Sequence, residues 1–276
     1  MSRLQRPKIL VIGELNVDIV ATGLRSVPEL GSEILAENCQ LTLGSASAIF
    51  AAGMAKLGHR VTFFSHVGQD YFGDFCLRTL KQSGVSTRHV TRKADEKTGV
   101  TIALSGKRDR ALVTYAGAVA TFKADSINET VMSSQDHVHL TSYYLQTRLR
   151  PSFARLLRQA KASGLTTSFD PNSDPRDKWD RNITAVLKYT DVLFVNEREA
   201  MKLMEQGLSP EDARARAQAK FGSPTVAADE CRDERGTAFI DNTIGDLQYA
   251  LRTFRRAPLA SLCHIPITAT LGEVRP

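Results

Sequence analysis

The chain has 276 residues, 42% of them hydrophobic and 24% charged, and its formal net charge is +6. This composition is ordinary for a soluble globular protein, and the length suits one large α/β domain or two small ones. No apolar run reaches the roughly 18 residues of a membrane-spanning helix, so no membrane association is expected. The basic residues are spread and do not alternate with aromatic ones, which argues against nucleic acid as a partner.

The N-terminus runs from a short basic arm directly into an apolar segment without a small-residue cleavage site, so no signal peptide is expected. The four cysteines are scattered and form no CxxC pair, which indicates neither a zinc site nor a disulfide framework. A reducing cytoplasmic location is the resulting expectation.

The first part of the chain predicts one buried strand, several half-exposed strands and two helices. The continuous apolar run KILVIG predicts a buried parallel strand, whereas alternating segments predict strands with one exposed face. Small apolar residues or an amphipathic pattern, each closed by Gly, predict helices. In chain order these are strands at 8–13, 14–23 and 33–44, a helix at 46–58, a strand at 60–68, a helix at 70–85 and a hairpin at 98–118 turning at GKRDR.

From residue 136 onward, strands alternate with helices. The predicted strands cover 136–144, 165–172 and 191–196, and the predicted helices cover 150–164, 182–190, 197–205 and 209–222. This rhythm predicts a parallel sheet with both faces covered by helices, while the early alternating strands predict a separate, half-exposed sheet.

Two groups of polar or small residues flank the first predicted strand and helix. Asn16 and Asp18 follow the first strand, where ligands of open α/β sheets bind, and a carboxylate there can accept hydrogen bonds from a polyol. An ordinary turn aspartate is the alternative. Gly44 and Ser45 precede the helix, where small residues let a ligand approach helix-start amides. Tight helix packing explains them equally well.

A third group lies in SFDPNSDPRDKW, residues 168–179, where Asp170, Asn172 and Asp174 end a strand. Pro171 and Pro175 stiffen this loop, so its polar groups are held in place. The pattern favours a binding site over a plain turn.

The fourth group is the Asn-x-x-Glu of Asn196 and Glu199, at the junction of a strand and a helix. A carboxylate there can hold magnesium through water, because magnesium keeps several of its waters. The alternative is a capping box, in which Asn caps the helix and Glu three residues later reaches back.

Together these segments resemble the ribokinase-like, or PfkB-type, carbohydrate kinases. The resemblance is carried by GELNVD, the small-residue loop leading into AAGMAKLGHRVTFFSHVGQDYFGDFCLRTLKQSGV, the T-G-V-T hairpin with YAGAVA, and then FDPN and VNEREA. It runs from about residue 7 to about residue 240, and it is most specific between 44 and 85.

The resemblance implies a ribokinase-like doubly wound α/β domain over residues 1–240 with a small β-sheet lid built from about 14–22, 33–43 and 98–117. Lid closure would keep water from the phosphate, and the exposed lid sheet is a plausible homodimer surface. The reaction implied is transfer of the γ-phosphoryl group of ATP to a hydroxyl of a sugar or nucleoside.

The resemblance also implies roles for single residues. Asp18 would hold sugar hydroxyls, and Gly44 with Ser45 would line the sugar site. Asn196 and Glu199 would serve ATP with Mg²⁺. Asn16, Asp170 and Asn172 complete the set of candidate substrate-binding residues.

The chain departs from the family pattern in two places. The family loop reads Gly-Gly-x-x-x-Asn, but here Ser45 replaces the second Gly and Ile49 replaces the Asn. The family signature Asp-Thr-x-Gly-Ala-Gly-Asp forms an anion hole and ends in the catalytic base. Here only DNTIGD, residues 241–246, stands in its place, so Asp246 is a weak candidate base.

The segment 241–276 does not resemble the family's C-terminus, and no lysine follows Lys220. A shift of reading frame between about 225 and 245 and a genuine but divergent tail both explain this, and we favour the former. The leading interpretation is thus a sugar kinase with little activity. The alternatives are a catalytically inactive sugar-binding or regulatory protein of this fold, and a dinucleotide-dependent oxidoreductase, which the lack of GxGxxG disfavours.

Overall fold

The computed structural model describes residues 6–106 and 109–206, apart from the side chain of Ser126. All of these residues belong to one compact unit of the chain. The predicted helix at 209–222, the tail at 241–276 and the boundary proposed near residue 240 lie outside the described residues.

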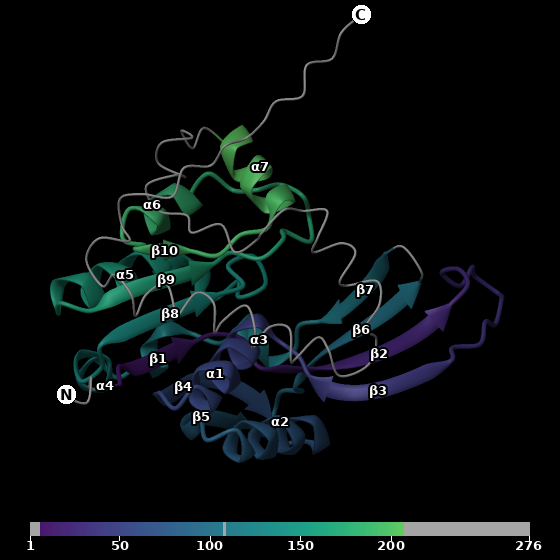
Figure 1. Ribbon diagram of the computed structural model, residues 1–276, viewed down its shortest axis with the longest axis horizontal. Coiled ribbons are helices and arrows are strands. Elements are labelled where there is room, and N and C mark those ends of the chain that lie inside the picture. Colours follow the sequence, from purple (N-terminus) through teal and green to yellow (C-terminus); the bar gives the residue numbers. More distant parts are fainter. Residues whose placement is uncertain (1–5, 107–108, 207–276) are drawn as a thin grey trace, which may run out of the picture. The chain divides into compact units, whose positions relative to one another are not determined.

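A six-stranded sheet forms the centre of the described unit (Figure 1). All of its neighbouring strands pair in parallel. In spatial order the strands are β10 (Val192–Leu193), β9 (Thr166–Asp170), β8 (His137–Thr141), β1 (Lys8–Ile12), β4 (Arg60–Gly68) and β5 (Ser86–Lys93). From β1 the chain adds β4 and then β5 on one side. It then returns to the other side of β1 and adds β8, β9 and β10, so the strand order reverses between β1 and β8.

A second, four-stranded sheet extends from the same unit. Its central pair is parallel and its two outer pairs are antiparallel. In spatial order its strands are β3 (Asn38–Leu43), β2 (Asn16–Leu24), β6 (Gly99–Gly106) and β7 (Arg110–Tyr115). We call it the small sheet.

Helices cover both faces of the large sheet. On β8, His139 stacks on Phe50 of α1, whereas the next residue, Leu140, joins a core cluster with Phe153 of α5. Because successive strand residues point to opposite faces, α1 and α5 lie on opposite sides of the sheet. The helices are α1 (Ala46–Lys56), α2 (Tyr71–Gln82), α3 (Ala118–Thr121), α4 (Glu129–Ser133), α5 (Phe153–Ala162), α6 (Ile183–Leu187) and α7 (Glu197–Glu205), with 3₁₀ turns at Ala124–Ser126 and Arg150–Ser152.

The fold class expected from the sequence is confirmed: a parallel sheet flanked by helices, with a second small sheet. Two expectations for single elements were wrong, and one strand was not predicted. Residues 33–37 precede β3 and are not strand, since β3 pairs with β2 only from Asn38 onward. The strand expected at 191–196 is confined to Val192–Leu193. Strand β5 was not anticipated, because its sequence STRHVTRK is polar and pairs only with β4 at the sheet edge.

Two histidines of β8 form a polar column with β9. The ring nitrogens of His137 lie 2.8 Å from Thr166 Oγ1 and 2.7 Å from Ser168 Oγ, and His139 Nδ1 lies 2.7 Å from the same Ser168 oxygen. Burial lowers the pKa of His137 to about 4, so this ring is neutral in the folded protein near pH 7.

We expect the free energy of unfolding to fall as the pH is lowered from about 6.5 towards 4. In this range the unfolded chain protonates His137, whose ordinary pKa is 6.5, while the folded protein keeps the ring neutral. Burial also lowers the pKa of His66 and of His89, so both add to the trend. Chemical denaturation at several pH values, with His137→Gln as the comparison, measures the effect. An unchanged pH dependence in the variant would contradict this assignment.

Candidate active site

The candidate residues lie where the parallel strands of the large sheet end. Glu14 follows β1, Thr141 ends β8 and Asp170 ends β9. Ligands of open α/β sheets bind at the carboxyl ends of the strands, where the strand order reverses. In this chain that point lies between β1 and β8.

Asn16, Asp18 and Gly44 are in direct proximity at the base of the small sheet. The Asn16 side-chain amide donates to Asp18 Oδ1 at 3.0 Å, and the Gly44 amide donates to the Asn16 carbonyl at 3.0 Å. A Cβ atom on Gly44 would clash with Asp18 Oδ1 and lie 2.6 Å from Asn16 Nδ2. Glycine at this position is therefore required for the observed placement of Asp18.

The carboxyl group of Asp18 is half-buried, and burial raises its pKa above the ordinary value. The hydrogen bond from Asn16 and the charge of Arg110 act in the opposite direction, and the charge of Glu14 adds to the rise. A carboxylate that has lost part of its hydration is stabilised by hydrogen-bond donors from a ligand. Sugar hydroxyls are such donors.

Ser45 occupies a backbone conformation that favours glycine. Its φ of 65° is positive, a conformation that a residue with a side chain adopts at a cost of about 1–3 kcal/mol. Its hydroxyl partly offsets this cost by accepting from the Ala48 amide at 3.3 Å, as the N-cap of α1. Ser45 thus adopts the backbone conformation that suits the family's second Gly, and its hydroxyl oxygen lies at the start of α1.

Ile49, at the second departure from the family loop, lies within α1 and is partly buried. Its aliphatic side chain has no hydrogen-bonding atom where the family pattern supplies an amide. A ligand therefore finds no side-chain amide at this position, where the family pattern supplies one.

Glu14 was not among the residues singled out from the sequence, although it is central to the site. Its side chain is only 2% exposed. One carboxylate oxygen accepts from the Ser47 amide at 3.2 Å, and the other accepts from Thr141 Oγ1 at 2.6 Å. Glu14 thus joins β1, the start of α1 and the end of β8. An acidic residue directly after a buried apolar run was the available signal.

Asp170 and Asn172 meet the end of β8 through Ser142. The Asp170 carbonyl accepts from the Ser142 amide at 2.8 Å, and the Asn172 side chain donates to Ser142 Oγ at 2.9 Å. Asp170 Oδ1 also accepts from the Asn172 amide at 3.1 Å. Asp174 instead accepts backbone bonds from Arg176, Lys178 and Trp179, so it organises its own loop.

Asn196 and Glu199 form the capping box of α7. Asn196 Oδ1 accepts from the Glu199 amide at 2.9 Å, and Glu199 Oε2 accepts from the Asn196 amide at 3.1 Å. Glu199 Oε1 accepts from Ser173 Oγ at 3.1 Å, which brings this pair beside the loop of Asp170 and Asn172. Glu199 is buried, with 6% of its surface exposed.

The structure therefore arranges the candidates in two clusters along one edge of the large sheet. Asn16, Asp18, Gly44 and Ser45 form the first cluster, beside β1 and the small sheet. Asp170, Asn172, Asn196 and Glu199 form the second, beyond β8 and β9. Glu14 and Thr141 lie between the two clusters. Asp246, the candidate base, lies outside the described residues.

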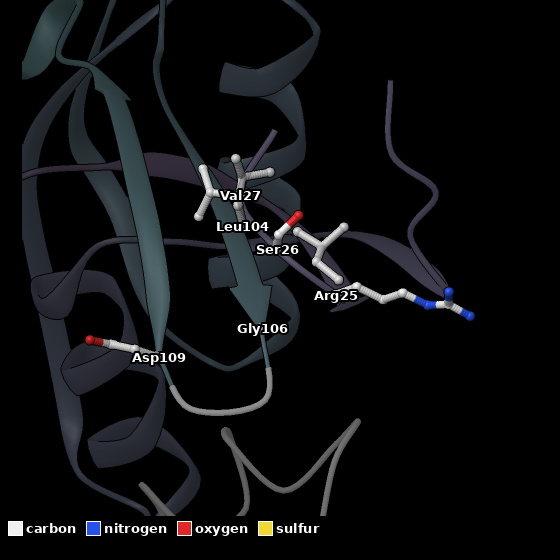
Figure 2. A pocket seen from close by; sticks show the side chains of 7 residues that line it. Arg25, Ser26, Val27, Leu104, Gly106 and Asp109 are labelled. Carbon is white, nitrogen blue, oxygen red and sulfur yellow. The ribbon is translucent and has the colours of Figure 1, made fainter. Parts of the chain in front are cut away.

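A separate cavity lies at the far end of the small sheet (Figure 2). It has a volume of about 340 Å³ and is lined by Leu24–Val27, Leu104, Gly106 and Asp109. None of the candidate residues lines it, so we do not assign the chemistry to this cavity.

Comparisons with known proteins identify the family to which the chain is related. The model of the pfkB family of carbohydrate kinases matches residues 6–230. The chain is 31% identical over 207 residues to the ATP-dependent ribose-1-phosphate kinase of Halopiger xanaduensis, covering 72% of this chain and 64% of that protein. It is 30% identical over 156 residues to the 2-dehydro-3-deoxygluconokinase of Bacillus subtilis, covering 54% of this chain and 48% of that protein.

The fold also matches solved structures. The crystal structure of a PfkB protein from Polaromonas sp. JS666 aligns with a TM-score of 0.63 at 24% identity, over 75% of this chain and 72% of that one.

The chain spans less than two thirds of the length of the two curated relatives, at 64% and 48%.

We expect Gly44→Ala to destabilise the protein by about 1–3 kcal/mol, because the new methyl group must displace Asp18 and Asn16. Gly106→Ala is the matched control, since the nearest atom to its added Cβ lies 3.5 Å away. Denaturant titrations measure both effects. Combining Gly44→Ala with Asp18→Ala removes part of the clash, so the two effects should not add. Strict additivity would show that the clash with Asp18 is not the cause.

Proposed function

The chain belongs to the pfkB family of carbohydrate kinases, and we propose that it binds a sugar at Asp18 and transfers the γ-phosphoryl group of ATP to one of its hydroxyls. The single observation that carries this proposal is the cluster of Asn16, Asp18 and Gly44 beside the point where the strand order reverses. A half-buried carboxylate there is suited to accept hydrogen bonds from a ligand rich in hydroxyl groups.

The face of the small sheet that carries Asp18 supports a sugar as the ligand. In the strand register, Asp18 lies between Thr42 of β3 and Thr101 of β6, and Thr101 lies opposite Thr114 of β7. The hydroxyl oxygens of Thr101 and Thr114 are 3.2 Å apart. A row of hydroxyl groups beside a carboxylate both donates and accepts, as hydroxyls of a sugar or nucleoside require. In this proposal the small sheet is the lid of the domain.

Asn196 and Glu199 would serve the nucleotide and its magnesium ion. Hydrogen bonds from Ser173 and Asn196 orient the Glu199 carboxylate, and carboxylates hold magnesium through its waters. In the described residues no three His, Cys, Asp or Glu side chains cluster as metal ligands. Magnesium that is held mainly by phosphates and water does not need such a cluster. When bound, it neutralises charge on the phosphates.

Phosphoryl transfer is expected to be slow. Asp246 is only a weak candidate for the general base, because DNTIGD has one Gly where the family signature has a Gly-Ala-Gly turn. Loss of a general base costs about 10² to 10⁴ in rate, and loss of an anion hole adds to this. The same observation favours a second function, a sugar-binding or regulatory protein without catalysis.

No helix within the described ranges is long and apolar enough to cross a bilayer. We propose a cytoplasmic enzyme with a small-molecule substrate and no nucleic acid partner.

Calorimetry and a coupled kinase assay test the function together. The probes are ribose 1-phosphate and 2-dehydro-3-deoxygluconate, the sugars in the names of the two relatives, each with and without ATP. We expect binding of at least one sugar, weakened at least tenfold by Asp18→Asn, and turnover that requires ATP and magnesium. Sugar binding without ATP binding would support the non-catalytic function. Turnover at ordinary kinase rates would refute the proposed impairment, and binding unaffected by Asp18→Asn would refute the sugar site.

We further propose that the small sheet pairs two copies of the chain through its other face. Ile102, Val113 and Tyr115 alternate with the residues of the Asp18 row, and they are 40%, 60% and 57% exposed. An exposed apolar face of this kind is typical of an interaction surface.

Val113→Lys should convert a dimer into a monomer in analytical ultracentrifugation, because it places a charge in the contact. Leu112→Lys is the matched control, because Leu112 is similarly exposed, at 53%, but lies on the Asp18 face. A monomeric wild-type protein, or equal effects of the two variants, would refute the pairing.

A further inference from the structure

Strand β6 of the small sheet begins directly after Thr98, whose side chain is 1% exposed. The Thr98 hydroxyl donates to Asp70 Oδ1 at 2.7 Å, and the Thr98 amide donates to Asp70 Oδ2 at 2.8 Å. The same hydroxyl accepts from the Gly68 amide at 2.9 Å. Asp70 also caps α2 by accepting from the Gly73 amide at 2.8 Å. The Asp70 carboxylate and the Thr98 hydroxyl together thus hold the end of β4, the start of α2 and the start of β6.

Three glycines permit this close approach. A Cβ atom on Gly68 would lie 2.5 Å from Asp70 Oδ2 and 2.6 Å from the Thr98 nitrogen. A Cβ on Gly73 would clash with the Gly68 carbonyl, and one on Gly99 would lie 2.8 Å from the Ala116 carbonyl. The backbone segments at this junction are in contact, with no room for a side chain between them.

The segment before β6 is held from its other side as well. The Lys97 carbonyl accepts from the Ala118 amide at 2.8 Å, and the Glu96 carboxylate accepts from the Thr121 hydroxyl. Both contacts come from α3, which follows the last strand of the small sheet. Residues 96–98 are thus fixed between α2 and α3.

The start of β6 sets the position of Asp18. In the parallel pairing of β2 and β6, Gly99 lies beside Asn16 and Thr101 lies beside Asp18. A Cβ added to Gly99 would lie 3.0 Å from the Asn16 Cβ. The Asn16 side-chain amide is 3.4 Å from Thr101 Oγ1 while it donates to Asp18. A displacement of β6 at Gly99 would therefore be transmitted to the carboxylate.

We propose that Asp70 and Thr98 form a clamp that positions β6, and through it the sugar-binding carboxylate Asp18. The proposal rests on the proposed sugar site, but the clamp itself is a property of the fold. Asp70 and Thr98 are positioning residues, because neither is assigned a contact with the substrate.

The charge of Asp70 strengthens the clamp. Burial alone would raise the pKa of Asp70, but the hydrogen bonds from Thr98 and Gly73 outweigh it and lower the pKa below its ordinary value. The carboxylate is therefore ionised near neutral pH, and its hydrogen bonds are charge-assisted.

Asp70→Asn separates the clamp from the helix cap. Asparagine is as good an N-cap as aspartate, so α2 keeps its start. The oxygen that accepts from the Gly73 amide also accepts from the Thr98 hydroxyl, so with the cap kept, the NH₂ group of asparagine faces the Thr98 amide and that hydrogen bond is lost. Asp74→Asn is the matched control, because it removes the same charge from the first turn of α2 but affects only an exposed ion pair with Arg92. Thr98→Val removes the hydroxyl, and Thr98→Ser restores it.

Hydrogen exchange of the full-length chain is the first readout, and calorimetry with ribose 1-phosphate, 2-dehydro-3-deoxygluconate and ATP is the second. We expect Asp70→Asn and Thr98→Val to speed exchange about tenfold in 99–103 and 16–20, without change in α5. They should weaken sugar binding about tenfold and leave ATP affinity unchanged. Asp74→Asn and Thr98→Ser should match the wild type.

If exchange were accelerated equally in α5 and β6, the contact between Asp70 and Thr98 would stabilise the whole fold and not β6 in particular, and the proposal would be overturned. Unchanged exchange in β6 would also overturn it. If the wild type binds neither sugar, the proposed function fails with these probes, and the exchange pattern still decides whether the clamp exists.

Discussion

The buried carboxylate of Glu14 is the interaction on which the arrangement of the site depends. A carboxylate removed from water is costly unless donors surround it, and Glu14 finds them in the Ser47 amide and the Thr141 hydroxyl. These donors belong to the start of α1 and the end of β8, which are far apart in the chain. Satisfying this one buried side chain therefore fixes the spacing of the elements that meet where the strand order reverses.

The small sheet is placed by close backbone contacts at its base. Gly44 follows β3 and Gly99 begins β6, so both lie where the small sheet joins the rest of the unit. A methyl group added to Gly44 would contact Asn16 and Asp18, and one added to Gly99 would contact Asn16. The repulsion between atoms in such contacts rises steeply over a short distance, so these contacts fix the position of a carboxylate more accurately than solvent-exposed ion pairs do. Thr42, Thr101 and Thr114 then lie in the same row as Asp18, while Ile102, Val113 and Tyr115 on the other face remain exposed.

The sequence predicted the parts of this structure that depend on local pattern. KILVIG predicts β1 because a parallel strand covered on both faces is apolar throughout, and VNEREA predicts the cap of α7 from its spacing alone. Strand β5 has no such pattern, since an edge strand can be polar. The pairing of Asp70 with Thr98 joins residues 28 positions apart, and the partners of Glu14 are 33 and 127 positions away. No pattern within a short segment of the sequence predicts such long-range contacts.

Structural and functional roles were treated as alternatives for Ser45 and for the pair Asn196 and Glu199, but the geometry makes them compatible. Ser45 caps α1 from a backbone with a positive φ, a costly conformation for which a helix cap alone gives no reason, because most caps are extended. Glu199 closes a capping box and also accepts from Ser173, in the loop that carries Asp170 and Asn172. A cap that is also bound to the neighbouring loop holds its carboxylate in one orientation. Such fixed orientation is what a site for a metal-bound nucleotide requires, so the cap supports the proposed role of Glu199.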